Sequence, residues 1–385
     1  MNRIEAEWIN RPDTQKVAGI LDSAGRQIFF VGGCVRNTLL GEPVDDIDIA
    51  TDAPPEEALS LYRSEGLTVV PTGIDHGTIT VMVNHVPYEI TTFRRDIETD
   101  GRHARVQFSD NLAEDARRRD FTMNALYASR HGEIVDPLGG LGDLQARRVR
   151  FIGDPDARIR EDYLRILRFF RFHAWYGNSE KGLDPAGLHA CEENQVGMET
   201  LSRERITAEL LKLLAAPDPV QALQVMGETG ILERILPGSK TRAVSDLVGL
   251  EYRHGLTPAP LRRLAALGDT SWQARLHLSR SQRKTLERLR DPAIRGLPAA
   301  VLGYRLGRDL AMDAVLIHAA ETGIDPEESN LSEIERGAAA KFPLKAADLM
   351  PEYTGPALGR RLAELERRWI ESGFSLSRDE LCSEA

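Results

Sequence analysis

The stretch FVGGCVRNTLLGEPVDDIDIAT, residues 30–51, decides how the first part of this 385-residue chain is expected to fold. It reads as an apolar strand that ends in two glycines, a short helix, and a second strand with alternating aspartates. Because successive side chains of a strand point to opposite faces, Asp46 and Asp48 share one face while Ile47 and Ile49 face the core. Two carboxylates at one spot repel each other unless a cation lies between them. Hard oxygen ligands at this spacing suit Mg²⁺ bound to a substrate's phosphates.

The turn ahead of the aspartates supplies the other half of such a site. Gly32 and Gly33 let the backbone approach a ligand closely, and the amides that enter the next helix can receive an anion. Arg36 adds a fork of donors suited to phosphate. The stretch has neither GxGxxG nor GKS or GKT, which excludes the dinucleotide-binding fingerprint and the Walker loop. A glycine pair alone most often marks a tight turn, and a lone DxD a solvated loop, but together with the arginine they predict a metal and phosphate site.

A third acid is needed if two metal ions are to be held around a phosphoryl transfer. Glu89 is the best candidate, because it lies on a later predicted strand of the same sheet and alternates with apolar Tyr88 and Ile90. The same alternation fits an ordinary solvent-facing strand residue, and the sequence leaves both interpretations open.

Composition and charge bound the class of protein. Hydrophobic residues make up 42% and charged residues 28%, as in ordinary globular chains, and the length suggests two or three domains. The net charge of −10 argues against a protein surface that is positive throughout. The arginines are unevenly placed along the chain, however, so a nucleic-acid partner is not excluded. Cys34, Cys191 and Cys382 form no CxxC pair, which argues against a disulfide framework or a structural zinc site. With neither a leader nor a long apolar run, the sequence predicts a cytoplasmic protein without a membrane span.

The pattern of the chain changes near residue 150. Before it, residues 1–27 read as a leading helix, and β-rich runs separated by turn residues follow, so an α+β part with a small mixed sheet is expected. After it, Leu, Ala, Arg and Glu recur at helical spacing, which predicts an all-α remainder. The charged segment 94–108 is expected to be a mobile loop near the site.

The most informative helix is expected at REDYLRILRFFRFHAWYG, residues 160–177. Its polar residues fall three apart and would form one stripe while Leu and Phe side chains pack elsewhere. Taken by itself, such a stripe is best explained by ion pairs on a helix surface. Its members are Asp162, Arg165, Arg168 and, less squarely, Arg171.

Several motifs together resemble one family. VGGCVRNTLLG followed by DDIDIAT, RRDFTMNAL at residues 118–126 and EDYLR at residues 161–165 are similar to signatures of the class II bacterial tRNA nucleotidyltransferases, or CCA-adding enzymes, and of the related poly(A) polymerases. Two positions depart from the family's usual pattern. Asn37 stands where relatives usually have Asp, and Met123 where they usually have Ile.

The resemblance implies roles for the first motifs. Asp46 and Asp48 would bind the catalytic metals, with Glu89 as the assisting third acid. The incoming nucleotide would be contacted by Gly33, Arg36 and Arg119, the last of these at the triphosphate.

The resemblance also implies that the polar stripe acts as a protein template. The Asp162 carboxylate could accept from an exocyclic amine and the Arg165 guanidinium could donate to a ring nitrogen or carbonyl, which matches cytosine and adenine. Uracil and guanine present the opposite pattern and would leave like groups facing each other. Arg168 and Arg171, in the same stripe, are expected to bind substrate as well.

These implications predict an enzyme that adds C, C and A to the 3′ end of tRNA from CTP and ATP. The 3′-hydroxyl would attack the α-phosphate in line, with Mg²⁺ as cofactor and pyrophosphate as the leaving group. Residues 1–150 would be the catalytic head, 151–215 a helical neck with the selecting motif, and 216–385 the body and tail that bind tRNA. Two alternatives stay open: a poly(A) polymerase or A-only adding enzyme of the same family, and a non-catalytic RNA-binding protein with a transferase-like head. The oligomeric state is not predicted.

Overall fold

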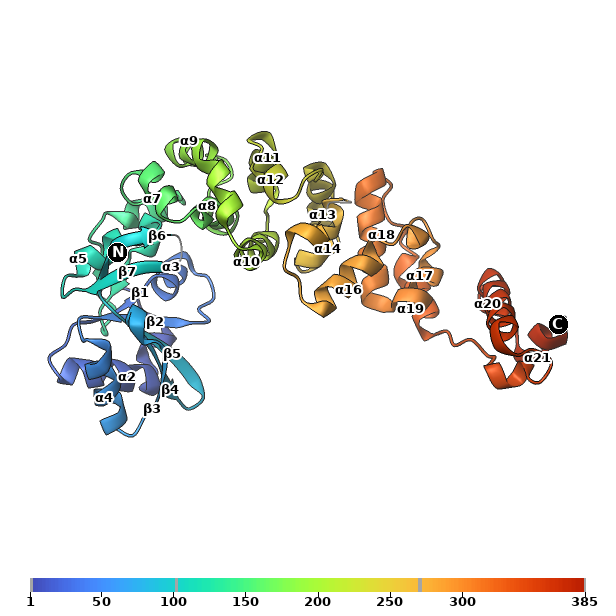
Figure 1. The fold of residues 1–385 in the computed structure, drawn as a ribbon, viewed down its shortest axis with the longest axis horizontal. Helices are drawn as coiled ribbons and strands as arrows, with labels where there is room; N and C mark the ends of the chain where they lie inside the picture. The colour runs from blue at the N-terminus through green and yellow to red at the C-terminus, as the bar shows by residue number, and fades with distance from the viewer. Residues whose placement is uncertain (1–2, 101–102, 269–271, 384–385) are drawn as a thin grey trace. The chain divides into compact units, whose positions relative to one another are not determined.

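The computed structural model describes residues 3–100, 103–268 and 272–383. The chain divides into two compact units (Figure 1). The first unit is Met1–Leu213 with Glu228–Arg234, and the second is Leu214–Gly227 with Ile235–Ala385. The segments expected to form the head and the neck therefore share the first unit.

The first unit is built on a seven-stranded sheet whose strand order is β3-β4-β5-β2-β1-β8-β9. β2 and β5 run parallel, and the other neighbouring strands run antiparallel, so the predicted small mixed sheet is confirmed. The strands are β1 (Ile28–Val31), β2 (Ile47–Thr51), β3 (Thr68–Gly73), β4 (Thr78–Val83), β5 (Val86–Thr92), β8 (Tyr127–Ala128) and β9 (Ile134–Val135).

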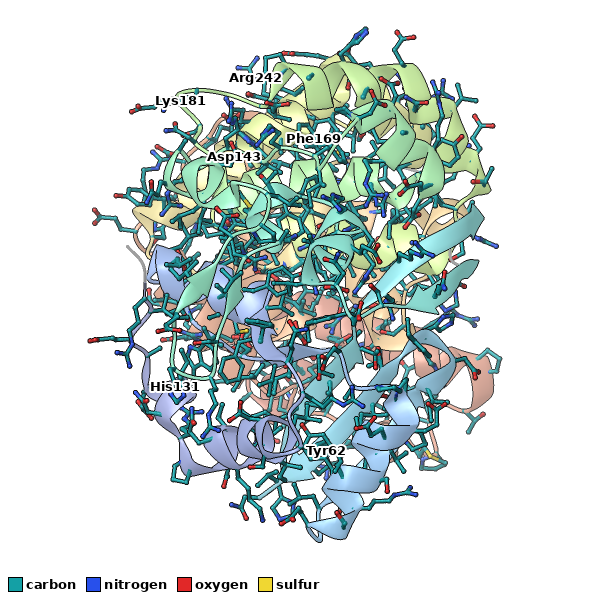
Figure 2. The ribbon with its side chains drawn as sticks, turned by 90° about the vertical axis from the view of Figure 1, so that its left-hand side faces the viewer. Tyr62, His131, Asp143, Phe169, Lys181 and Arg242 are labelled. Atoms are coloured by element: carbon teal, nitrogen blue, oxygen red, sulfur yellow. The ribbon has the colours of Figure 1, made fainter. Side chains whose placement is uncertain are left out.

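Short helices connect and cover these strands (Figure 1). The expected leading helix is two helices, because Arg11 adopts an extended conformation (φ −57°, ψ 135°) ahead of Pro12, and a residue before proline is disfavoured in a helix. The buried Tyr62 of α4 donates from its hydroxyl to the carbonyl of Val17 in α2 at 3.1 Å, which ties two of these helices together (Figure 2). The helices are α1 (Glu7–Asn10), α2 (Pro12–Ser23), α3 (Gly33–Leu40), α4 (Pro55–Ser64), α5 (Leu112–Arg117) and α6 (Gly140–Gln145).

The segment expected to be a loop at residues 94–108 forms a hairpin instead. β6 (Arg94–Asp100) and β7 (His103–Phe108) pair antiparallel as a separate two-stranded sheet. Residues 101–102, at the tip of the expected loop, lie outside the described residues. Phe108 fixes the base of the hairpin, since a Cβ on Gly77 would lie only 2.8 Å from its ring. The prediction was wrong because the alternation here lacks the regular apolar residues that mark a strand in sequence.

The expected helix over residues 160–177 is interrupted. α7 (Pro155–Glu161) ends at Asp162, which is extended (φ −158°, ψ 104°), and α8 (Leu164–Tyr176) begins two residues later. The Asp162 carboxylate accepts from the backbone N–H of Leu164 at 3.1 Å, so the side chain caps α8 instead of continuing α7. Further helices of this part are α9 (Pro185–Asn194), α10 (Arg203–Leu214) and α12 (Ile231–Ile235).

The second unit contains helices only, among its described residues, and the predicted all-α remainder is confirmed. Its interior holds a buried ion-pair network in which the fully buried Arg263 binds Glu251 and donates to the backbone carbonyl of Leu214 at 2.7 Å. The helices are α11 (Val220–Glu228), α13 (Thr241–Arg253), α14 (Pro260–Ala266), α15 (Trp272–Arg275), α16 (Arg280–Leu289), α17 (Ala299–Leu306), α18 (Arg308–Thr322), α19 (Asn330–Ala339), α20 (Gly355–Glu371) and α21 (Arg378–Ser383).

Two glycines let α17 and α19 cross in direct backbone contact. A Cβ on Gly337 would lie 1.8 Å from the carbonyl oxygen of Ala300, and one on Gly303 would lie 2.1 Å from that of Ile334. The helices can therefore approach this closely only with glycine at both positions.

We expect Gly337→Ala to destabilise the second unit by about 2 kcal/mol or more, because the added methyl group must push two backbones apart. Urea unfolding followed by circular dichroism measures the change. Gly359→Ala is the matched control, since Gly359 is exposed in α20 with no atom within 4 Å of its added Cβ. That variant should be neutral or more stable by up to about 1 kcal/mol. Equal effects of the two substitutions would contradict the close crossing.

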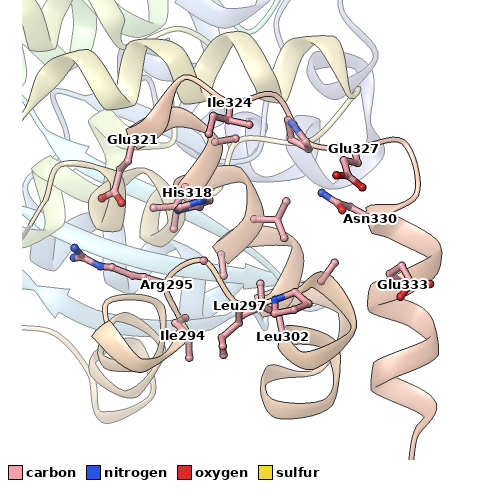
Figure 3. A pocket seen from close by; sticks show the side chains of 18 of the residues that line it. Ile294, Arg295, Leu297, Leu302, His318, Glu321, Ile324, Glu327, Asn330 and Glu333 are labelled. Atoms are coloured by element: carbon pink, nitrogen blue, oxygen red, sulfur yellow. The ribbon is translucent and has the colours of Figure 1, made fainter. Parts of the chain in front are cut away.

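The second unit also contains a cavity of about 570 Å³ next to α18 and α19 (Figure 3). Apolar Leu297 and Leu302 line it together with the carboxylates of Glu321, Glu327 and Glu333. Such a lining does not suit an anionic nucleotide.

Across the described ranges of the chain, no helix is both long and apolar enough to cross a membrane.

Candidate active site

Three acids gather on one face of the sheet, at its interior strands β2 and β5. Asp48 on β2 lies directly beside Glu89 on β5 in the parallel register, and Asp46 immediately precedes β2. Ile47 and Ile49 are buried on the opposite face, as the alternation predicted. The sequence-predicted acids are thus brought to the same face.

The environment of Asp48 favours a cation beside it. Burial, together with the charges of Glu89 and Asp46, raises the pKa of its carboxyl to about 6 against the opposing effect of Arg119 and Arg36. In the described residues no group of three Asp, Glu, His or Cys side chains is placed to hold a metal ion by itself. Two aspartates with further oxygen ligands from water or phosphate form the donor set that a hard divalent cation prefers, so the residues present fit such an ion.

The glycine turn places two arginines next to these acids. Gly32 has φ +69°, a conformation that favours glycine, and stands immediately before α3. A Cβ on Gly32 would lie 3.5 Å from Nη1 of Arg119, and one on Gly33 would lie 3.9 Å from Nη2 of Arg36. Both guanidinium groups therefore lie against the turn.

Arg36 is buried, and its donors already have partners. It donates to the Asn37 side-chain oxygen at 2.8 and 3.1 Å, to that of Asn124 at 2.5 Å and to the Tyr176 hydroxyl at 2.8 Å. Its guanidinium also lies 4.1 Å from the centre of the Tyr176 ring. Arg36 thus joins α3 to α8, whereas the sequence predicted a fork that faces phosphate. Asn37, the departure from the family pattern, accepts two of these bonds without adding a negative charge.

Arg119 is held in place by the buried carboxylate of Asp115. It donates to Asp115 at 3.0 Å and to the Tyr127 hydroxyl at 3.1 Å, while Arg118 binds the other oxygen of Asp115 at 2.7 Å. Burial would raise the pKa of Asp115, but the charges of Arg119 and Arg118 and the bond from Tyr127 outweigh it and lower this pKa to about 2. Asp115 thereby fixes Arg119, whose Nη1 stays directed at the glycine turn.

We expect Asp115→Asn to destabilise the fold by about 3 kcal/mol at pH 7, because it leaves two partly buried guanidiniums without their carboxylate. A carboxyl whose pKa is lowered from 3.8 to about 2 contributes stability that is present above pH 3.8 and lost as pH falls through about 2. The difference between wild type and variant should therefore shrink from pH 5 to pH 2. Urea unfolding over this range measures it, with the exposed Asp110→Asn as the control. A difference that does not depend on pH would contradict the assignment.

The glycine-rich segment before residue 150 packs against the RRDFTMNAL motif next to the site. The buried Asp143 accepts from the Thr122 hydroxyl and from Nε of Arg150, both at 2.7 Å (Figure 2). A Cβ on Gly140 would lie 2.2 Å from the carbonyl oxygen of Thr122. The glycine-rich segment before residue 150 therefore packs directly on the RRDFTMNAL motif and fixes it.

Asp162 and Arg165 do not form the ion pair that a helical stripe would give. Asp162 binds Nη2 of Arg205 at 2.7 Å. Arg165 instead forms an ion pair with Glu161 and donates to the carbonyl of Arg158 at 2.6 Å. Each of the two residues is therefore oriented by a partner of its own.

The break between α7 and α8 is held open by Tyr163. A Cβ on Gly197 would lie 2.0 Å from Cε1 of the Tyr163 ring, so the ring packs directly on the backbone there. Only glycine leaves this space, and the contact fixes the residue between Asp162 and α8.

The last two members of the expected stripe differ in position. Arg168 donates to Asp120 at 2.8 Å, a bond that joins α8 to the RRDFTMNAL motif, and its charge helps to hold the pKa of the buried Asp120 below the usual range against the effect of burial. Arg171 binds Glu209 at 2.5 Å and lies over the ring of Phe172. Arg171 is thus turned toward α10 and does not line the cavity, because each step of three residues along α8 rotates the side chain by about 60° away from the previous one.

One cavity of about 430 Å³ unites most of these residues. Gly32, Gly33 and Asn124 lie on its wall. Asp46, Glu89 and Arg171 are not among its lining residues. Its arginines are Arg36, Arg118, Arg119, Arg165, Arg168 and Arg205. Its aspartates are Asp48, Asp120 and Asp162. Six cations against three acids give it a positive lining that suits a polyphosphate, in contrast to the larger cavity of the second unit.

Sequence reasoning missed Arg205, Asp120 and Asn124 as members of the site. Arg205 lies in the LSRERI segment, residues 201–206, which predicts a helix start and resembles a stretch of the family but indicates no role for Arg205. Its partner Asp162 is 43 residues away, and neither spacing nor periodicity reveals a pair at that separation.

Comparison with known proteins gives two family matches. Residues 28–150 match the family described as Poly A polymerase head domain, and residues 183–241 match the one described as Probable RNA and SrmB-binding site of polymerase A.

Similar full-length proteins carry related names. CCA tRNA nucleotidyltransferase 1, mitochondrial, of Danio rerio is 33% identical over 376 residues, which is 93% of this chain and 86% of that protein. The CCA-adding enzyme of Geobacillus thermodenitrificans (strain NG80-2) is 41% identical over 233 residues, 59% of this chain and 56% of that protein. The crystal structure of the Bacillus stearothermophilus CCA-adding enzyme in complex with CTP has a TM-score of 0.72 at 27% identity and covers 94% of each chain. The chain therefore belongs to the family of the tRNA nucleotidyltransferases, the CCA-adding enzymes.

Proposed function

We propose that the chain adds C, C and A to the 3′ end of tRNA, without a nucleic-acid template, from CTP and ATP. One observation carries the proposal: a single positively lined cavity contains Asp48 of the acidic face of the sheet together with Asp162 and Arg165 of the α7–α8 break. A residue suited to metal binding and a pair suited to reading a base thus face the same space. Relatives named CCA-adding enzymes support the substrate assignment.

Asp46 and Asp48 would hold divalent metal ions, and we propose Mg²⁺, because their hard oxygen donors suit it. When bound, the metal neutralises charge on the phosphates and activates the attacking 3′-hydroxyl. Glu89 would support this set from the neighbouring strand, where it lies beside Asp48.

The glycine turn and the arginines would hold the triphosphate. The backbone at Gly33 can approach a phosphate closely, and Nη1 of Arg119 is directed at the same turn. Arg36 would contribute its charge from behind the turn, since its own donors are bound to Asn37, Asn124 and Tyr176.

Asp162 and Arg165 would select the base. Each oxygen of the Asp162 carboxylate now accepts one bond, from Leu164 or from Arg205, and keeps a second lone pair for the exocyclic amine of cytosine or adenine. Arg205 is then a positioning residue that holds the carboxylate ionised and in place. Arg168 would form the wall of the pocket, and Arg171 would act only indirectly, by fixing Glu209.

The test uses tRNA that ends at the discriminator base. With CTP alone we expect addition of C, and with CTP and ATP the complete CCA end, with pyrophosphate released in proportion and only in the presence of a divalent metal. Incorporation of A from ATP alone would contradict this proposal. Repeated A addition would favour a poly(A) polymerase, which the name of the matching head family keeps as the alternative. If no pyrophosphate is released under any condition, the chain is a non-catalytic RNA-binding protein.

We also propose a functional division of the chain into a catalytic head (1–150), a neck that selects the base (151–215), and a body and tail that bind tRNA (216–385). A cytoplasmic location is likewise proposed, from the absence of disulfide patterning in the sequence.

A further inference from the structure

The solvent face of α16 in the second unit carries an unusual cluster of cations. Arg280, Arg283 and Lys284 are exposed and Arg288 is half-buried. These four residues, called the α16 basic face below, have no ion-pair partner within the part of the chain that the structure describes. Such a face on a chain with net charge −10 calls for a physical explanation.

The geometry of the helix brings the four side chains together. Spacings of three and four residues place Arg280, Arg283, Lys284 and Arg288 on one side of α16. Leu286 and the neighbouring Leu289 are buried on the other side and hold the basic face outward. The side chain of Glu287 is exposed on the same side, so the face carries four cations and one acid.

On this face the lack of partners extends over four neighbouring cations. Several exposed arginines elsewhere in the second unit do have nearby carboxylates: Arg253 binds Asp325 at 2.9 Å, and Arg308 binds Glu335 at 3.2 Å. The whole chain has 59 Asp and Glu against 49 Lys and Arg, so acids are not scarce. Like charges four residues apart, such as Arg280 and Lys284, destabilise a helix, and no internal contact offsets this repulsion here.

The scaffold beneath the face is ordered by specific bonds. The Ser279 hydroxyl accepts from the backbone N–H of Gln282, and the Gln282 side chain accepts from the N–H of Ser279, which closes a capping box. The half-buried Arg288 donates to the carbonyl of Arg305 at 2.9 Å, which fixes the cation at the C-terminal end of the face.

We propose that the α16 basic face binds the phosphate backbone of the RNA substrate. Guanidinium forks match phosphate geometry, and three arginines and one lysine, against the single acid Glu287, suit a contact to phosphate that does not read sequence. The face lies outside residues 183–241, the segment that matches the RNA-binding family, and adds a contact farther along the chain. This inference rests on the proposed function only in taking the RNA to be tRNA.

The test removes three charges from the face of the full-length protein. The combined variant Arg280→Gln, Arg283→Gln and Lys284→Gln is compared with wild type for binding to tRNA without its CCA end, at several salt concentrations. Each phosphate contact contributes about 0.9 to the slope of log affinity against log salt, so three lost contacts should reduce the slope by about 2 to 3. The KM for tRNA should rise at least tenfold, while kcat and the KM for CTP stay unchanged. Arg283→Gln alone should reduce the slope by about 1.

A matched control changes the same net charge in the same unit. It combines Arg253→Gln, Arg308→Gln and Arg336→Gln, all of which have acidic partners. This control should keep the wild-type slope. An equal loss of slope in both triple variants, an unchanged slope in the α16 variant, or a loss confined to kcat would overturn the inference. A wild-type protein that binds tRNA through this face but adds no nucleotide would instead overturn the proposed function and leave the inference intact.

Discussion

Asp48→Asn is expected to lower kcat for nucleotide addition by about 10³-fold or more. The amide has the shape of the carboxylate but no charge with which to bind a divalent ion, and a metal contributes several kcal/mol to a transition state of this kind. Initial rates of CTP incorporation into tRNA measure the effect at saturating substrate.

The same substitution is expected to leave the metal-free fold no less stable. Since burial and the neighbouring acids raise the pKa of Asp48 from 3.8 to about 6, the folded chain binds this proton more tightly than the unfolded chain. The ionised form therefore costs stability, and this cost develops as pH rises from 3.8 through 6. At pH 7 the variant should be more stable by about 1 kcal/mol, after allowance for the partial exposure of the side chain.

Metal addition separates the two effects. Mg²⁺ should raise the melting temperature of the wild type and leave that of Asp48→Asn unchanged, because only a folded state that binds the ion is stabilised by it. Asp45→Asn is the control, since Asp45 is the exposed neighbouring acid on the chain and is not part of the cavity. Residual activity of Asp48→Asn above a tenth of wild type would remove Asp48 from the metal site.

Asp162→Asn is expected to lower kcat/KM for both CTP and ATP by about 10- to 100-fold. A hydrogen bond to a charged group contributes about 1.5–3 kcal/mol, and the amide replaces one acceptor with a donor that meets the base's amine unfavourably. Addition of UTP should fall much less, because uracil offers a carbonyl at that position. Selectivity for C over U should therefore collapse, and parallel incorporation assays with each of the four nucleotides measure it.

Two further variants establish that Asp162 acts on the base. Asp156→Asn removes a nearby carboxylate of α7 that does not line the cavity, and it should keep full selectivity. Arg205→Met should reproduce the loss of selectivity in weaker form, and Arg205→Lys should restore part of it. The effects of Arg205→Met and Asp162→Asn should not add, because one acts through the other. Uniform loss with all four nucleotides would assign Asp162 a structural role only.

The sequence predicted the shared face of the two aspartates because side chains along a strand alternate with a strict period of two. Asp46 and Asp48 had to share a face once Ile47 and Ile49 were assigned to the core, and no tertiary information was needed. The neighbour of Asp48, in contrast, depends on which strand pairs with β2. Glu89 could be identified as a candidate, but its parallel register with Asp48 is a property of the sheet topology.

The break at Asp162 was not predicted because the i, i+3 spacing of polar residues continues across it. A helix pattern does not show that an aspartate side chain competes with the backbone for the N–H of Leu164. The partners Arg205 and Glu209 come from α10, a separate helix, and such pairings follow from packing and not from local propensity. The shared face of Asp46 and Asp48 could therefore be predicted from the sequence, whereas the partners of Arg36 in the first motif and of Asp162 in the second could not.

The contact between Gly197 and Tyr163 has a consequence for how accuracy in such an enzyme can change over evolution. Any side chain at position 197 must displace the ring of Tyr163. Because Tyr163 lies in the break between α7 and α8, the positions of Asp162 and Arg165 would then change as well. A substitution of Gly197, which does not line the cavity, can therefore change the fidelity of base selection. Screens for error-prone or relaxed variants should include this remote glycine alongside the pocket itself.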